Sequence, residues 1–321
     1  MRVFLTGGTG FIGGTVASQL RDAGHQVVAL VRDPARAGAL TDAGVELVRG
    51  DLSSAEVILE AARDADAAIH AAAIYRVGVR AAEAEQLRRS NVDGTRTALD
   101  AIVAAGVPRI VHVSTVGIFG NTQGAVVDED HPVARPPFGS VYEETKVAAH
   151  AIAREHIVAG APIVIVQPSA VYGPRDHSEI GDLIRRAAAG SLPALPFGDM
   201  GITMVHVDDV AAGIILALGR GTVGEQYVLS SSDHVRARDL VARAAALGGR
   251  RAPRLDVPTG LLRALAPAGR VIGPLAGMPS NLRELVAASD GVTYWARHDK
   301  ATRELDYRPR DLAVGLPTAL S

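Results

Sequence analysis

Short apolar runs alternate with longer amphipathic stretches through the first half of the chain. The runs are continuously apolar, as is typical of strands buried on both faces of a parallel sheet. The stretches between them carry apolar residues at helical spacing. The pattern predicts strands over residues 3–5, 27–31, 45–48, 67–70, 110–113 and 163–167, and helices over residues 13–23, 81–105 and 141–159. We therefore expect an α/β protein whose parallel sheet is covered by helices on both faces.

The pattern changes after about Pro168, where glycine and proline become frequent and the elements shorten. It predicts helices over residues 180–189 and 210–219 and strands over residues 204–206 and 226–229. No clean linker separates the two halves, so we expect them to interleave. Residues 1–170 should form the sheet domain, which also receives later segments such as 204–230, and residues 171–321 should form mainly a smaller cap.

Composition and charge narrow the classes of function. The 321-residue chain has a net charge of −2 and no evident basic face, which argues against a nucleic-acid partner. It has no cysteine, which excludes thiol catalysis, disulfides and cysteine–metal sites. The N-terminus leads directly into a strand without a signal-like segment, and no apolar run approaches the roughly 18 residues of a membrane span. We expect a soluble, cytoplasmic protein.

An apolar segment at residues 261–288 belongs to the second half of the chain. Several helix breakers interrupt it, which argues against a membrane span. They are Pro267, Gly273, Pro274, Gly277 and Pro279. The segment could close a pocket, form a dimer face or touch a membrane surface, and the sequence alone does not choose among these.

A glycine-rich turn, Thr6-Gly-Gly-Thr-Gly-Phe-Ile-Gly13, follows the first predicted strand and begins the first helix. Its spaced glycines allow a tight turn, close approach of the backbone to a pyrophosphate, and close packing of helix on strand. The helix N-terminus adds unpaired N–H groups and a partial positive charge. We therefore expect a Rossmann-type, doubly wound sheet that binds a dinucleotide. The expected contacts of the turn are Gly7, Thr9, Gly10, Phe11 and Ile12.

The end of the second strand bears on the choice of cofactor. An acidic residue there would bind a free ribose 2′-hydroxyl, but Val31 occupies the position and Arg32 follows it. The planar guanidinium of Arg32 suits a 2′-phosphate. We therefore favour NADPH over NADH. Two alternatives stay open: Asp33 could bind the ribose of NADH, and Arg32 could be an ordinary solvated strand end.

Tyr142 and Lys146 lie four residues apart, which places a phenol and an ammonium on one face of a predicted helix. A free phenol has a pKa near 10 and is a poor base at neutral pH. A cation one turn away stabilises the phenolate, so we expect it to lower the pKa of Tyr142. Such a tyrosine can exchange a proton with a substrate oxygen.

Together these motifs resemble those of the extended short-chain dehydrogenase/reductase superfamily, which includes the NAD-dependent epimerases/dehydratases, and within it the dihydroflavonol-4-reductase-like enzymes. The resemblance covers essentially the whole chain and rests on the order and spacing of short segments. These are Thr6–Gly13, Gly50-Asp-Leu52, His70-Ala-Ala-Ala73, Asn91-Val-Asp-Gly-Thr95, Val113-Ser-Thr115, Phe119-Gly120, Tyr142-x-x-x-Lys146, Pro168-Ser-Ala-Val-Tyr-Gly173 and Val205-His-Val-Asp-Asp-Val210. The resemblance implies an NAD(P)-dependent oxidoreductase with a Rossmann domain and a smaller C-terminal substrate-binding cap.

The resemblance also implies catalytic roles. Tyr142 would be the general acid/base, and Lys146 would tune its pKa and hold the nicotinamide ribose. Thr115 would hydrogen-bond the substrate oxygen, with Ser114 as a residue that could share this role. Asn91 would orient a water or a backbone carbonyl in a proton relay, or it could be only a helix N-cap.

The remaining implied contacts belong to the cofactor and the substrate. Asp51 and Leu52 would meet the adenine, although Asp51 could simply form a turn. Ala71, Ala72 and Ala73 would lie along the cofactor, and Pro168, Ser169 and Val171 would present backbone N–H groups to the nicotinamide carboxamide. A largely apolar substrate pocket should include Tyr75, Val116, Phe119 and Met204.

Three functions remain open at this stage. We favour an NADPH-dependent reductase acting on a ketone or aldehyde of a small, largely apolar molecule. A sugar-nucleotide epimerase or dehydratase is the first alternative, and a non-catalytic NADP-sensing module is the second. His206 beside Asp208 and Asp209 is interpreted as a strand-to-helix junction with a capping aspartate, and we expect no metal site. The resemblance suggests a homodimer formed through the helices over residues 81–105 and 141–159.

Overall fold

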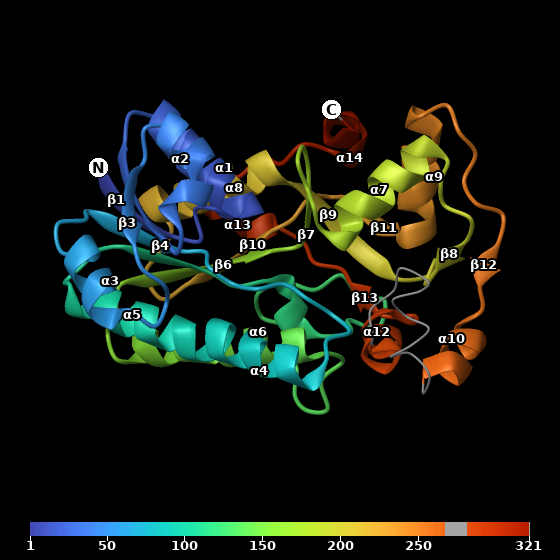
Figure 1. Cartoon of the computed structure of the whole chain (residues 1–321), viewed down its shortest axis with the longest axis horizontal. Helices are drawn as coiled ribbons and strands as arrows, with labels where there is room; N and C mark the ends of the chain where they lie inside the picture. Colours follow the sequence, from blue (N-terminus) through green and yellow to red (C-terminus); the bar gives the residue numbers. More distant parts are fainter. Residues whose placement is uncertain (267–280, 321) are drawn as a thin grey trace.

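A computed structural model describes residues 1–266 and 281–320, and a seven-stranded parallel sheet forms its centre (Figure 1). The strand order is β10-β6-β5-β4-β1-β2-β3. The strands are β1 (Arg2–Thr6), β2 (Gln26–Val31), β3 (Glu46–Arg49), β4 (Ala67–His70), β5 (Ile110–Val113), β6 (Ile163–Pro168) and β10 (Gln226–Leu229). The apolar runs predict all seven, and every pairing is parallel. The direction of winding reverses between β1 and β4, where such sheets bind ligands at the carboxyl ends of their strands.

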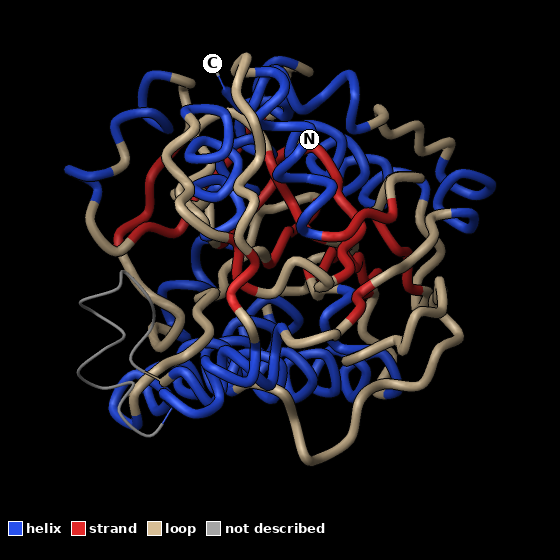
Figure 2. The backbone as a smooth tube through the Cα atoms, turned by 90° about the vertical axis from the view of Figure 1, so that its right-hand side faces the viewer, coloured by secondary structure: helices blue, strands red, loops and turns tan. Residues whose placement is uncertain are grey.

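Helices cover both faces of this sheet, as the continuously apolar strands predict (Figures 1 and 2). On one face, α1 (Phe11–Asp22) packs on β1 and β2 while α8 (Val207–Arg220) packs on β5 and β6 and against α1, with Val16 and Ile214 in their shared core. On the other, α3 (Ala55–Ala62), α5 (Gly94–Ala104) and α6 (Val141–Val158) enclose a second core. Burial of these two apolar layers is the main term that stabilises such a sheet.

The long helix predicted over residues 81–105 is one helical run with an irregular centre. It consists of α4 (Ala81–Arg88), a π-helical turn (Arg89–Asp93) and α5. Single π-turns inside helices are often found at functional sites. This one carries Asn91, whose side chain bonds to Ile74, in the loop after β4, and to Thr145 of α6.

The second half builds a smaller unit against the carboxyl edge of the sheet. Its sheet contains β7 (Ala170–Tyr172), β9 (Gly201–His206), β11 (His234–Arg236) and β13 (Thr293–Tyr294). The helices α7 (Glu179–Ala189) and α9 (Ala237–Leu247) pack together beside it. The alanine-rich α9 and the short α3 are absent from the sequence predictions, because alanine gives little contrast in a hydrophobic pattern.

The apolar segment at residues 261–288 is described only at its ends, by α10 (Thr259–Leu265) and α12 (Leu282–Ser289). Its predicted breakers Pro267, Gly273, Pro274, Gly277 and Pro279 lie outside the described residues. Over the part of the chain that the structure describes, none of the helices has the length and apolar character needed to cross a membrane.

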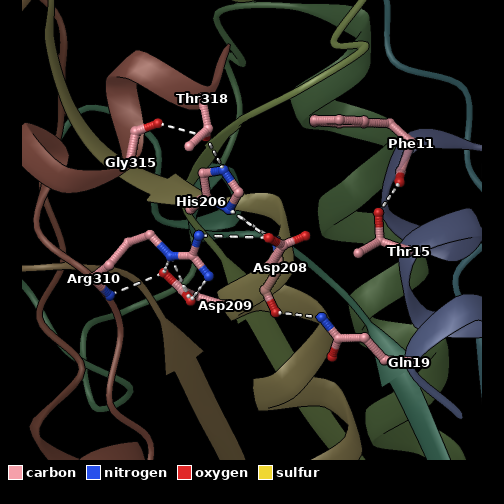
Figure 3. Close-up of polar contacts among 9 residues, drawn as sticks. All are labelled: Phe11, Thr15, Gln19, His206, Asp208, Asp209, Arg310, Gly315 and Thr318. Carbon is pink, nitrogen blue, oxygen red and sulfur yellow. Dashed lines mark hydrogen bonds and ion pairs between the residues drawn. The ribbon is translucent and has the colours of Figure 1, made fainter. Parts of the chain in front are cut away.

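A polar junction fastens the C-terminal segment to α8 (Figure 3). Asp209 accepts hydrogen bonds from the backbone N–H of Arg310, at 2.9 Å, and from its guanidinium, at 3.0 Å. His206 accepts the N–H of Asp208 through Nδ1 and lies 2.9 Å from the Thr318 hydroxyl. The strand-to-helix junction is therefore as expected, but its cap is the imidazole of His206 and not an aspartate.

We expect Asp209→Ala to lower the free energy of unfolding by about 2–4 kcal/mol, because it leaves the Arg310 guanidinium without its buried carboxylate. Urea denaturation measures the change. Asp42→Ala is the matched control, since Asp42 is exposed and its carboxylate has no partner among the described residues; its effect should stay within about 0.5 kcal/mol. Equal stability of the two variants would contradict the structural role of Asp209.

Candidate active site

The glycine turn builds a site that fits a pyrophosphate. Gly7 has a φ of +81°, and a Cβ on Gly13 would lie 2.2 Å from the Gly7 carbonyl oxygen, so both positions require glycine. Gly10 is the N-cap of α1, no side chain in the described part of the chain accepts a capping hydrogen bond there, and no acidic residue lies in the first turn. The N–H groups and the positive end of the helix dipole therefore remain available to an anion. Thr9 and Gly10 are exposed, while Phe11 and Ile12 are half-buried.

Arg32 and Asp51 follow the neighbouring strands β2 and β3 and lie near each other. The pKa of Asp51 is lowered by hydrogen bonds from Ser53, and the charge of the exposed Arg32 adds to this shift. Asp51 Oδ1 accepts from the Ser53 N–H at 2.8 Å, so this carboxylate does build the turn considered as its structural alternative. Asp33 Oδ1 accepts the N–H of Ala35 at 3.1 Å and caps the next turn. Leu52 is half-buried against Gly94 of α5.

Asn91 joins the loop after β4 to α6. Its Oδ1 accepts the Ile74 N–H at 2.8 Å, and its Nδ2 donates to the Ile74 carbonyl at 2.9 Å and to Thr145 Oγ1 at 3.1 Å. The alternative that Asn91 is a helix N-cap is wrong, because it lies within the π-helical turn of a continuous helix. It does hold a backbone carbonyl. The loop that it fixes begins with Ala71, Ala72 and Ala73, whose first two residues contact Gly7.

Thr115, and not Ser114, faces Tyr142. A hydrogen bond between Thr115 and the phenol acts to lower the pKa of Tyr142. Thr115 Oγ1 also accepts the Gly117 N–H at 3.1 Å, which caps the 3₁₀ turn Val116–Phe119. Ser114 is buried and lies 3.1 Å from Nδ1 of His150, two turns along α6 from Tyr142. The Ser114 hydroxyl therefore makes its hydrogen bond within the protein interior.

Burial, and not their mutual interaction, determines the direction in which the pKa values of Tyr142 and Lys146 on α6 are shifted. Burial raises the pKa of Tyr142 to about 12, against the smaller lowering by Thr115. Burial also lowers the pKa of Lys146 to about 8. The expected lowering of the Tyr142 pKa is thus wrong for this structure, because Lys146 Nζ donates to the Val113 carbonyl at 3.1 Å and does not offset the loss of water around the phenol. At neutral pH the phenol is protonated and Lys146 is mostly charged.

Three buried histidines surround this lysine, and sequence spacing gives no sign of them. The imidazoles of His70 and His112 stack with centroids 5.4 Å apart, and Thr6 Oγ1 lies 2.8 Å from His70 Nδ1. Burial, with the charge of Lys146 as a further cause, lowers the pKa of His70 to about 3 and of His150 to about 4. They are neutral at pH 7. Among the described residues no cluster of histidine and acidic side chains is suited to a metal ion.

Pro168 and Ser169, at the end of β6, do not offer the free backbone N–H groups that the resemblance implies. Pro168 has no N–H, and its carbonyl accepts from Thr115 Oγ1 at 3.4 Å. The N–H of Ser169 is occupied by the Leu229 carbonyl at 3.1 Å, because the β6–β10 ladder continues past the strand end. The Ser169 hydroxyl, in contrast to its N–H, is buried without a partner among the described residues. Val171, half-buried, lies in β7 beside β9.

One of the four expected substrate residues lies against Tyr142. Tyr75 is 50% exposed, and its ring meets that of Tyr142 edge to face, with centroids 4.7 Å apart. Val116 and Phe119 are 5% and 4% exposed within a small core cluster. Met204 is completely buried against Ile202 and Leu240, and therefore packs the cap instead of lining a pocket in this structure.

Comparison with known proteins agrees with this geometry. The model of the family described as "NAD dependent epimerase/dehydratase family" matches residues 3–230. A relative from Stigmatella aurantiaca, 4-hydroxy-2-methyl-3-oxo-4-farnesyl-3,4-dihydroquinoline-1-oxide ketoreductase, is 32% identical over 97% of this chain and 92% of its own. A Synechocystis sp. protein whose name refers to dihydroflavonol 4-reductase is 33% identical, over 99% of this chain and 93% of its own.

A solved structure is also similar over the whole chain. It is a double mutant of dTDP-glucose 4,6-dehydratase from Streptomyces venezuelae with NAD and DAU bound. The match has a TM-score of 0.80 and 27% identity, and covers 100% of this chain and 96% of the other. The similar proteins thus include both reductases and a sugar-nucleotide dehydratase.

Lys146→Met should remove a specific pH dependence of stability. The pKa of Lys146 in the folded protein, about 8, lies below the ordinary 10.5, so the unfolded chain binds more protons between these values and this contribution to stability rises with pH. We expect the free energy of unfolding of the wild type minus that of the variant to increase by about 2–3 kcal/mol from pH 8 to pH 10.5. Urea denaturation of cofactor-free protein at each pH measures it.

Lys300→Met is the matched control. Burial lowers and a hydrogen bond with Glu225 raises the pKa of Lys300, and the net shift is upward. Its contribution to stability is therefore lost only as the pH rises above 10.5. If the difference in the free energy of unfolding between the wild type and Lys146→Met stays constant from pH 8 to pH 10.5, the Lys146 ammonium is not desolvated.

Proposed function

Because the chain belongs to the NAD dependent epimerase/dehydratase family, we propose that it is an NADPH-dependent reductase that converts a ketone or aldehyde of a largely apolar molecule to an alcohol. The observation that carries this proposal is the adjacent pair of hydroxyls, Thr115 and a Tyr142 that stays protonated far above neutral pH. A protonated phenol is what reduction requires, since a carbonyl that accepts hydride must also receive a proton.

The bound cofactor would supply the hydride. The hydroxyls of Thr115 and Tyr142 hydrogen-bond the carbonyl oxygen and stabilise the negative charge that develops there. Tyr142 then gives its proton to this oxygen, because an alkoxide is a stronger base than a phenolate. Lys146, one helical turn away on α6, would hold the nicotinamide ribose of the bound cofactor.

Arg32 supports NADPH as the cofactor. It is exposed at the carboxyl end of β2, next to the strand that carries the glycine turn, so its guanidinium is available to a 2′-phosphate. Asp33, the residue that could have bound the ribose of NADH, has one carboxylate oxygen committed to the Ala35 N–H. Arg32 is therefore the donor at this edge that would bind an additional phosphate.

The similarity to dTDP-glucose 4,6-dehydratase supports a sugar-nucleotide dehydratase or epimerase as the second candidate. Both of those reactions begin with oxidation of a hydroxyl, for which Tyr142 would have to act as a base. A phenol with a pKa of about 12 is seldom ionised at neutral pH. Reduction is therefore the direction that these residues favour. Cofactor that co-purifies and does not exchange would support the second candidate instead.

Tyr142→Phe should reduce the kcat of carbonyl reduction by about 10²–10⁴, since it removes the proton donor. NADPH affinity, measured by calorimetric titration, should change less than about twofold, because the ring and its packing remain. Tyr307→Phe is the control: the Tyr307 hydroxyl is buried without a partner in the described chain, and its loss should leave turnover intact. Equal losses of turnover and cofactor affinity in the Tyr142 variant would make it a structural residue.

Arg32→Ala should raise the KM for NADPH about tenfold or more and leave that for NADH nearly unchanged, because charge-assisted hydrogen bonds are worth about 1.5–3 kcal/mol. Steady-state kinetics with both cofactors measure this. Arg63→Ala removes the same charge from an exposed site at the end of α3 and should leave both values unaltered. A wild-type protein that prefers NADH would refute the assignment of Arg32.

A further inference from the structure

Glu284 of the cap helix α12 reaches two segments of the catalytic half. Its Oε1 accepts the N–H of Val141, the first residue of α6, at 2.8 Å. Its Oε2 accepts the N–H of Val79, in the loop after β4, at 3.0 Å. One carboxylate thus binds the backbone of the residue before Tyr142 and the backbone of the loop that carries Tyr75. Glu284 is half-buried, which strengthens these charge-assisted bonds.

The start of α12 is built to hold this carboxylate. Asn281 caps the helix by accepting the Glu284 N–H at 3.3 Å, and its Nδ2 donates to Glu284 Oε2 at 3.1 Å. Asn281 also binds the loop directly, through the Gly78 carbonyl at 3.1 Å and the Val79 carbonyl at 3.2 Å. Asn and Glu at this spacing usually close a capping box within their own helix. Here the glutamate reaches to other segments instead.

The loop over residues 74–79 is consequently fixed at both ends. Asn91 holds the N–H and the carbonyl of Ile74, and Glu284 with Asn281 holds Gly78 and Val79. Tyr75 lies between these anchors, and its ring and that of Tyr142 meet edge to face. The first turn of α6, which bears Tyr142, receives its own cap from Ser140 and a second acceptor from Glu284. A carboxylate at this position also complements the helix dipole.

We propose that Glu284 is a positioning residue that sets Tyr142 and Tyr75 relative to each other from the cap, so that correct seating of α12 completes the catalytic geometry. The inference rests on the proposed function in one respect, namely that Tyr142 is the proton donor. A purely structural role would stabilise α12 alone. A positioning role instead requires that the loop and the first turn of α6 loosen together when the carboxylate is removed.

Hydrogen–deuterium exchange tests this directly and needs no substrate. In Glu284→Ala, amides of residues 74–80 and 140–144 should exchange about tenfold faster or more, because Val79 and Val141 lose their acceptor. Glu284→Gln offers a single acceptor oxygen and should give an intermediate change. Arg283→Ala, on the same helix and without a side-chain partner among the described residues, should match the wild type. Unchanged exchange in both segments of Glu284→Ala would overturn the proposal.

Kinetics provide the second readout. In Glu284→Ala the kcat should fall roughly tenfold or more, since misplacing a reacting group by about 1 Å costs up to 10²-fold, while NADPH affinity should change less than about twofold. Faster exchange with unaltered kcat would also overturn the positioning role. If the wild-type protein reduces no carbonyl compound, the proposed function fails, and the exchange pattern alone then decides whether Glu284 joins the two segments.

Discussion

Lys146 is 5% exposed, and the candidate site is arranged around the burial of its ammonium. A buried charge is costly unless it is hydrogen-bonded or paired. Here it has the Val113 carbonyl at 3.1 Å, while the adjacent histidines stay neutral and add no competing charge. The same burial that lowers the pKa of Lys146 raises that of Tyr142. The site therefore holds a protonated phenol on the same helix as a poorly solvated cation, and the proposed reduction needs that protonated phenol.

The topology brings these groups to one edge. Thr115 follows β5, Ser169 follows β6, and Tyr142 and Lys146 lie on the helix packed beneath these strands. Parallel strands place their carboxyl ends together, so short segments far apart in the chain converge there. The cap reaches the same region through Glu284, which accepts the N–H groups of Val79 and Val141. Catalytic geometry of this kind depends on contacts between the two halves as well as on the sheet itself.

Much of this arrangement could be predicted from the sequence. Continuous apolar runs predict the seven strands, because strands buried on both faces leave a strong signal. The glycine turn and the Tyr142–Lys146 pair are visible in the spacing of residues along single elements, whereas Thr115 follows only from the family resemblance. The resemblance also implies Asn91. Its π-helical turn and its hydrogen bonds to Ile74 could not be predicted, because the spacing of hydrophobic residues carries no information about a single widened turn.

Other features depend on tertiary contact and leave no local pattern. The direction of the Tyr142 pKa shift is one, because it follows from desolvation and not from the distance along a helix to Lys146. The stacked His70 and His112 come from strands adjacent only in the folded sheet. Asn281 and Glu284 predict a helix start, yet the binding of Glu284 to Val79 and Val141 requires the cap to be placed first. Met204 illustrates the converse, since an apolar residue near a site can equally belong to the core.

The most direct test of the central claim is the fate of the hydride. NADPH carrying deuterium at its hydride-donating position would be incubated with the protein and a panel of apolar ketones and aldehydes, and the products analysed by mass spectrometry. The account predicts alcohol with one deuterium on the former carbonyl carbon, formed in equal amount to NADP⁺. Isomerisation or loss of water from a sugar nucleotide, with no net consumption of cofactor and no reduction of any carbonyl compound, would contradict it.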